Sequence, residues 1–281
     1  MPVIAMTREL GSRGNEVAEG LAQDLGLALV RHDFVERLAE SARLSTCTVM
    51  RWMDGRATLL ERWRAERSGL PLFVEEQLLE RAALGRVVIR GWGAIHLLRA
   101  VPHALCVRVC APIDVRAQRM MDILGLESAG RARDEVLRSD ACRAAALRRH
   151  FGDACEQAPR YDMVLDTGTW HVGRCIAQIR RALELREYQP TPESRALLAA
   201  LALSARIRSA LRRDHATAGF RISVQSNANG RPGHVALEGM VIDEGERLAA
   251  EDVARRCDGV SGIENRLRPM WSGRIARHLN G

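Results

Sequence analysis

Short apolar segments recur along the first 187 residues, separated by stretches in which apolar residues return every three or four positions. Short apolar runs are typical of buried strands, and the longer periodic stretches are typical of amphipathic helices. The expected strands lie at residues 3–6, 27–30, 86–94 (ending in a glycine-bearing turn), 104–112 and 161–167. Strands that alternate with helices in this way predict an α/β domain whose parallel sheet carries helices on both faces.

A different pattern follows at the C-terminal end. Residues 188–194 contain two prolines among polar side chains, which favours a linker. The order helix, strand, strand, helix, strand comes next, with the expected strands at 220–224, 235–241 and 259–267. The chain is therefore expected to comprise an α/β domain at 1–187, the linker at 188–194 and a small α+β domain at 195–271.

The turn between the first strand and the first helix reads Thr-Arg-Glu-Leu-Gly-Ser-Arg-Gly over residues 7–14. A strand, a glycine loop and a helix together point backbone N–H groups and the positive end of a helix at a bound anion, usually phosphate. The match to G-x-x-x-x-G-K-[ST] is partial, because Glu9 stands at the first glycine, Asn15 at the lysine and Glu16 at the hydroxyl position. The turn fits either a phosphate-binding loop or an ordinary strand-to-helix connection.

The charge of the chain bears on this choice. A net charge of +7 suits anionic partners, and all 42 basic residues are arginines. No lysine elsewhere in the chain can therefore supply the charge missing from the loop. Arg13 is the nearest cation, although its planar guanidinium differs from a compact ammonium. A solvated arginine-rich surface explains the same charge without a ligand, and no recognisable module supports nucleic-acid binding.

Cysteine usage and hydropathy predict a cytoplasmic protein. The seven cysteines are an odd number without a C-x-x-C pair, which indicates reduced thiols rather than a disulfide framework or a zinc site. The N-terminus lacks the charged and apolar segments of a signal peptide. No run approaches 18 apolar residues, so we expect no membrane-spanning helix. The sequence assigns no residue as a metal ligand.

Residues 125–150 form an expected helix in which arginine is unusually frequent. Such a helix is either a solvated face or a lid whose guanidinium groups neutralise a phosphoryl group during transfer. Asp140 precedes Arg143 by three residues, about one helical turn, so its carboxylate can orient the guanidinium.

Taken together, these motifs resemble the cytidylate kinase-like family of P-loop kinases over about the first 187 residues. The similarity rests on the glycine loop, on Asp33 after the second strand and on an Ala-Pro-x-x-x-Arg-x-x-Arg segment over residues 111–119. It continues with the Asp140–Arg143 pair and a closing Tyr-Asp-x-x-Leu-x-Thr strand. Residues 195–271, with V-x-L-x-G-x-V and G-V-x-x-I-x-N-x-L patterns, are similar to a BON domain.

The resemblance implies an ATP-dependent nucleoside monophosphate kinase that uses Mg²⁺ and accepts CMP. It implies that the donor phosphates lie on Gly11, Ser12, Arg13, Gly14 and Asn15. It places the acceptor nucleotide near Asp33 and Arg90. It assigns the charge-neutralising and catalytic roles to Arg116, Arg119, Asp140 and Arg143. For the BON-like domain it implies a protein or anionic lipid partner.

Two positions depart from the family pattern. Arg13 stands at one of the three loop glycines of the family, between Gly11 and Gly14, and Trp92 stands where the family has an arginine after the strand at 86–90. Arg90, two positions upstream on the same strand face, is the hypothesised substitute. With Asn15 and Glu16 in the loop, these departures leave an alternative open, in which the chain is a weak or inactive nucleotide-binding sensor and its BON-like module docks a partner or an anionic membrane surface.

Overall fold

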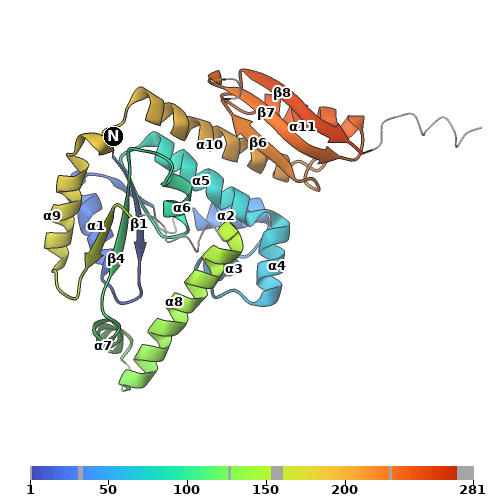
Figure 1. Ribbon diagram of the computed structural model, residues 1–281. Helices are drawn as coiled ribbons and strands as arrows, with labels where there is room; N and C mark the ends of the chain where they lie inside the picture. The colour runs from blue at the N-terminus through green and yellow to red at the C-terminus, as the bar shows by residue number, and fades with distance from the viewer. Residues whose placement is uncertain (1, 31–33, 126–127, 153–160, 228–229, 271–281) are drawn as a thin grey trace, which may run out of the picture. The chain divides into compact units, whose positions relative to one another are not determined.

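The computed structural model describes residues 2–30, 34–125, 128–152, 161–227 and 230–270 (Figure 1). Contacts between residues divide the chain into two compact units. The first unit comprises Met1–Ser68 and Leu84–Ser194, and the second comprises Gly69–Ala83 and the chain from Arg195 onward.

The first unit is built on a five-stranded sheet in which every neighbouring pair of strands is parallel (Figure 1). The strand order is β2-β3-β1-β4-β5, so β1 is the central strand. The strands are β1 (Val3–Arg8), β2 (Ala28–Val30), β3 (Val87–Arg90), β4 (Ala104–Cys110) and β5 (Met163–Asp166). The predicted fold class, a parallel sheet flanked by helices, is confirmed.

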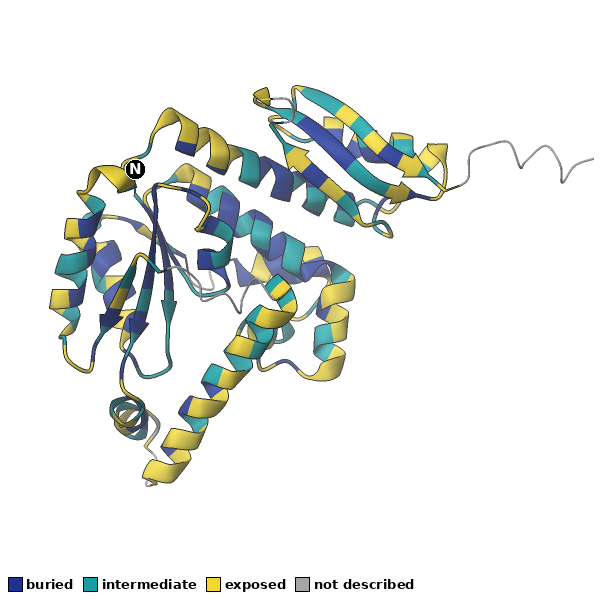
Figure 2. Ribbon diagram, viewed as in Figure 1, coloured by how far each residue is buried: buried dark blue, intermediate teal, exposed yellow. Residues whose placement is uncertain are grey.

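Apolar side chains that the sequence pattern assigned to strands and helices form the core of this sheet. Helices α1 (Gly14–Leu25) and α9 (Val172–Leu183) cover one face, and most of the central strand is coloured as buried (Figure 2). On this face Ile4, Val17 and Ile179 are fully buried. Helix α6 (Ala94–Leu98) packs against β1 and β4 from the other side. Apolar burial of this kind is the main stabilising contribution to such a fold.

Further helices connect the strands. Between β2 and β3 lie α2 (Val35–Ala42), α3 (Thr46–Met53) and α4 (Leu59–Ser68). Between β4 and β5 lie α7 (Ile113–Leu124) and α8 (Ala129–Phe151), and α8 is the arginine-rich helix that the sequence predicted. Gly26 ends α1 in the left-handed conformation, with a φ of 60°, as a C-cap glycine does. A short 3₁₀ turn (Arg186–Tyr188) follows α9.

The second unit contains a three-stranded sheet of order β6-β7-β8. Its first strand pair is antiparallel and its second is parallel. The elements are α10 (Pro192–Arg213), β6 (Ile222–Ser226), β7 (His234–Val241), α11 (Glu244–Arg255) and β8 (Gly262–Pro269). The predicted helix, strand, strand, helix, strand order is therefore confirmed.

Helix α5 (Leu70–Leu84) groups with this second unit, although in sequence it lies between α4 and β3. Three arginines of α10 pair with three glutamates of α5. The pairs are Arg206 with Glu80 at 2.9 Å, Arg208 with Glu75 at 2.8 Å, and Arg213 with the buried Glu76. No helix in the described part of the chain is both long and apolar enough to cross a membrane.

Candidate phosphate-binding site

The loop that follows β1 is folded back on itself at the end of the central strand. Ser12 is fully buried, and both its backbone N–H and its hydroxyl donate to the carbonyl oxygen of Glu9, at 3.2 and 2.8 Å. Gly11 has a φ of 78°, and a Cβ at this position would lie 2.8 Å from the carbonyl oxygen of Arg116. Only glycine fits this position without displacing α7.

The first residue of α1, Gly14, is also held at close quarters. A Cβ there would lie 2.5 Å from the Cβ of Arg8. Arg13, between the two loop glycines, has a φ of 56°, so this position, a glycine in the family pattern, keeps a backbone conformation typical of glycine. A non-glycine residue pays about 1–2 kcal/mol for it. The Arg13 guanidinium is half-exposed and lies 3.5 Å from Glu16.

Glu9 ties the exit of β1 to the exit of β4. One carboxylate oxygen accepts from Arg108 at 2.6 Å, and the other lies 3.4 Å from Nε of Arg116 and accepts from the N–H of Ala111 at 3.4 Å. The residue that replaces the first glycine of a phosphate loop therefore points its charge at arginines of the protein itself. This network holds the loop in place through contacts within the protein.

Arg116 and Arg119, both predicted to be catalytic, bind groups of the protein in and around the loop. Arg116 is 6% exposed, donates from Nε to Ala111 O at 3.0 Å and pairs through Nη1 with Asp140 at 2.8 Å. Arg119 donates from Nη1 to Gly11 O at 3.1 Å and from Nη2 to Thr167 O at 2.7 Å. The hydroxyl of Thr167 in turn donates to Ser12 O at 2.7 Å. These contacts give both arginines a part in shaping the loop.

A second group of guanidinium groups gathers at the start of the loop. Arg143 of α8 donates from Nη1 to the main-chain oxygen of Arg8 at 2.7 Å. Nε of Arg8 is buried and has no hydrogen-bond partner within the described part of the protein. Burial lowers the pKa of Arg8 to about 10, and the charges of Arg143 and Arg90 add to the effect while Asp54 opposes it. A buried donor that lacks a partner, inside a group of like charges, favours a bound anion.

The remaining predicted residues are placed as follows. Arg90, at the end of β3, donates to the side-chain oxygen of Asn15 in the first turn of α1. Asp140 was predicted to orient Arg143, but its carboxylate pairs with Arg116 instead, and Arg143 donates to the main chain of Arg8. Asp33 lies outside the described residues, so its predicted role stays a prediction. The sequence assigns no role in the site to Arg8 or Glu9. Only their position inside the loop motif points to them.

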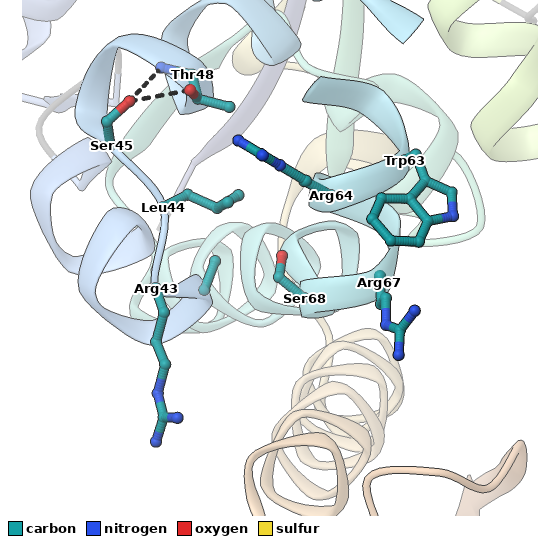
Figure 3. A pocket seen from close by; sticks show the side chains of 9 residues that line it. Arg43, Leu44, Ser45, Thr48, Trp63, Arg64, Arg67 and Ser68 are labelled. Carbon is teal, nitrogen blue, oxygen red and sulfur yellow. Dashed lines mark hydrogen bonds between the residues drawn. The ribbon is translucent and has the colours of Figure 1, made fainter. Parts of the chain in front are cut away.

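A pocket of about 510 Å³ lies elsewhere in the first unit, among the end of α2, the start of α3 and α4 (Figure 3). Its lining includes Arg43, Arg64 and Arg67 but no residue of the loop. The guanidinium of Arg64 points toward Ser45 and Thr48, whereas the guanidinium groups of Arg43 and Arg67 point away from that of Arg64 (Figure 3). The three charges therefore do not converge on one anion.

Family models match both parts of the chain. The model described as the cytidylate kinase-like family matches residues 3–169, and the BON domain model matches residues 201–268. Both resemblances drawn from the sequence are thereby confirmed. None of the curated proteins matches the chain.

Solved structures are also similar to the chain, at low identity. An uncharacterized protein from Eubacterium ventriosum is 18% identical, with a TM-score of 0.47, and the match covers 66% of this chain and 100% of that one. Shikimate kinase from Bacteroides thetaiotaomicron is 15% identical, with a TM-score of 0.39 and coverage of 66% and 99%. Shikimate kinase from Acinetobacter baumannii, solved with shikimate, is 15% identical, with a TM-score of 0.36 and coverage of 65% and 93%.

Proposed function

The chain belongs to the cytidylate kinase-like family, and we propose that its first unit transfers the γ-phosphoryl group of ATP to a nucleoside monophosphate, CMP in particular. The observation that carries the proposal is the buried Nε of Arg8 beside the glycine loop, an atom that has no hydrogen-bond partner among the residues that the structure describes. An anion at this position satisfies the donor and offsets the repulsion among Arg8, Arg90 and Arg143.

The protein's share of the reaction is to position the two nucleotides and to neutralise charge. In the proposed complex, the N–H groups at the start of α1 and the positive end of that helix face the donor phosphates. Arg8 and Arg143 supply the charge that the lysine supplies in the general G-x-x-x-x-G-K-[ST] phosphate loop. The observed contacts of Arg116, Arg119 and Asp140 are with the protein itself, so we assign them the role of holding the loop and α8 in position. Arg90 and Asp33 are the proposed acceptor contacts.

The residues of the loop fit nucleotide phosphates, since Gly11 and Gly14 leave no room for side chains and Nε of Arg8 has no partner within the described ranges of the chain. When bound, Mg²⁺ supplies further neutralisation of the phosphates. Mg²⁺ prefers carboxylates and phosphate oxygens, and Glu16, exposed in the first turn of α1, is the carboxylate at the position of the usual loop hydroxyl. We propose that Glu16 holds the metal in place of that hydroxyl.

The second candidate function is that of a nucleotide-binding sensor, and several residues of the site favour it. Asn15 and Glu16 stand where the general phosphate-loop motif has a lysine and a hydroxyl, and Trp92 stands where the family pattern has an arginine. Arg116 and Arg119 are already engaged by the protein. These observations favour a nucleotide-binding sensor with little or no turnover. In both proposals the BON domain binds a protein or an anionic lipid surface.

Two measurements on the purified full chain separate the proposals. Calorimetry gives the affinity for ATP with and without Mg²⁺, and an ADP assay with each nucleoside monophosphate gives turnover. ATP binding with ADP formation that depends on the monophosphate supports the kinase. Binding without such turnover supports the sensor, and absence of ATP binding contradicts both.

A further inference from the structure

The C-terminal end of α8 is packed into an aromatic cluster formed by Trp52, Trp92, His96, His150 and Phe151. Trp92 lies between the strand β3 and helix α6, and its ring centroid is 4.6 Å from that of Trp52 on α3 and 5.4 Å from that of His150 on α8. Phe151 stacks on His96 of α6 with centroids 4.7 Å apart and planes at 18°. Three segments that are distant in sequence thus meet at the end of the arginine-bearing helix: α3, the Trp92 turn with α6, and the last residues of α8.

The turn that carries Trp92 is shaped around this contact. Gly91, Trp92 and Gly93 have φ values of 82°, 49° and 69°, three consecutive left-handed residues. A Cβ at position 93 would overlap the ring of Phe151, so glycine lets the end of α8 approach the turn. A bulky residue rarely adopts a positive φ, and this backbone conformation persists only where surrounding contacts hold the residue. The contacts of the Trp92 ring with Trp52 and His150 are such a constraint.

The same helix carries the groups that reach the loop. Arg143 donates to the main chain of Arg8, and Asp140 pairs with Arg116. Both residues lie two to three helical turns before His150. Gly55, just after α3, also lies against this helix, since a Cβ there would be 2.7 Å from the carbonyl oxygen of Cys142. Fixing the helix end therefore restricts where the Arg143 guanidinium lies.

We infer that Trp92 is a positioning residue, which docks the end of α8 so that Arg143 is held at the start of the phosphate loop. This inference rests on the proposed function for its catalytic consequence. Where the family pattern has an arginine, this chain has Trp92, whose ring contacts Trp52 and His150. The consequence is a lid helix that is docked by the protein rather than by the phosphates of a ligand.

The test uses the full chain with three variants: Trp92→Ala, the conservative Trp92→Phe and, from the helix side, Phe151→Leu. Trp63→Ala is the matched control, because Trp63 is 54% exposed and lies outside the cluster. Hydrogen exchange is followed at residues 140–146, and kcat, KM and ATP affinity are measured in parallel. One aromatic contact corresponds to a change of roughly tenfold in such a local equilibrium.

For Trp92→Ala we expect exchange at 140–146 to rise about tenfold and kcat to fall, with ATP affinity within about twofold. Phe151→Leu should act in the same direction, Trp92→Phe should restore most of both values, and the control should change neither. Unchanged exchange at 140–146 in folded variants, or faster exchange confined to 148–151, overturns the inference. Faster exchange with unaltered turnover also overturns it. Absence of turnover in the wild type contradicts the proposed function instead, and exchange at 140–146 then decides the positioning role.

Discussion

Nη1 of Arg143 lies 2.7 Å from the main-chain oxygen of Arg8, and this hydrogen bond joins α8 directly to the strand that leads into the glycine loop. Burial lowers the pKa of the Arg143 guanidinium, and the nearby charges of Asp54 and Asp140 oppose that effect. A charged donor in this setting is held in a fixed geometry before a ligand arrives. Such preorganisation is what stabilisation of a phosphoryl group in transfer requires.

Replacing Arg143 with alanine should reduce turnover far more than binding, because charge that neutralises the transition state acts on kcat. We expect kcat to fall by at least ~100-fold, by analogy with other phosphoryl-clamping arginines, and ATP affinity to fall much less. Steady-state kinetics beside calorimetry make the comparison. Arg148→Ala is the control, since Arg148 is exposed on the same helix. Full activity in Arg143→Ala would remove Arg143 from the site.

Replacing Gly14 with valine should abolish ATP binding in a folded protein. The new Cβ would lie 2.5 Å from the Cβ of Arg8, so either the loop or Arg8 must shift. Gly173→Ala in α9 is a matched control, because the corresponding Cβ meets its nearest neighbour, His171, at 3.4 Å. Calorimetry measures the affinity, and circular dichroism reports the fold. Unchanged affinity in folded Gly14→Val would mean that phosphates bind elsewhere.

The stability that His150 contributes should depend on pH. Burial lowers the pKa of His150 from its usual 6.5, with the Glu66 carboxylate opposing, and burial and Arg99 lower that of His96. The unfolded chain therefore takes up protons that the folded chain does not. This contribution to the free energy of unfolding is complete above pH 6.5 and is lost as the pH falls below it.

Urea unfolding of wild type and His150→Gln at pH 7.5 and 5.5 checks this expectation. If His150 is held neutral, the stability difference between wild type and variant narrows at the lower pH. His215→Gln, at an exposed position, controls for the loss of a histidine as such. If wild type and His150→Gln differ in free energy of unfolding by the same amount at both pH values, protonation of His150 does not destabilise the folded chain, and the expectation is wrong.

Much of the fold follows from local pattern, whereas most of the site does not. Apolar runs predict the strands because parallel strands are buried on both faces, and Gly26 marks a helix end because few other residues adopt its φ. The engagement of Arg119 with Gly11 spans 108 residues, and that of Arg143 with Arg8 spans 135. Family motifs name these arginines, but spacing does not reveal that their partners are main-chain oxygens.

Helix α5 illustrates the same limit. Its sequence predicts a helix among other helices, and nothing local shows that Glu75, Glu76 and Glu80 face arginines more than 100 residues away. Likewise, the aromatic cluster joins Trp52, Trp92 and His150, which lie on separate elements of the chain. Contacts of this kind depend on tertiary arrangement, which periodicity does not encode.

The grouping of α5 with the second unit can be tested at Glu76, which is 5% exposed and paired with Arg213. Glu76→Ala removes the buried carboxylate that pairs with Arg213 and should lower the free energy of unfolding of this unit by about 2 kcal/mol. Glu80→Ala, at a more exposed pair, should cost about 0.5 kcal/mol. Hydrogen exchange at β7 during urea titration measures both. Loss of protection in β1 with β7 unaffected would contradict the grouping.

The central claim is that this chain moves a phosphoryl group, and isotope transfer tests it most directly. Full-length protein is incubated with Mg²⁺, CMP and ATP labelled in the γ-phosphoryl group, and the products are separated. The kinase proposal predicts label in CDP, at a rate that falls at least ~100-fold in Arg143→Ala. Label that stays in ATP, or that appears only as inorganic phosphate, with every nucleoside monophosphate offered would contradict it.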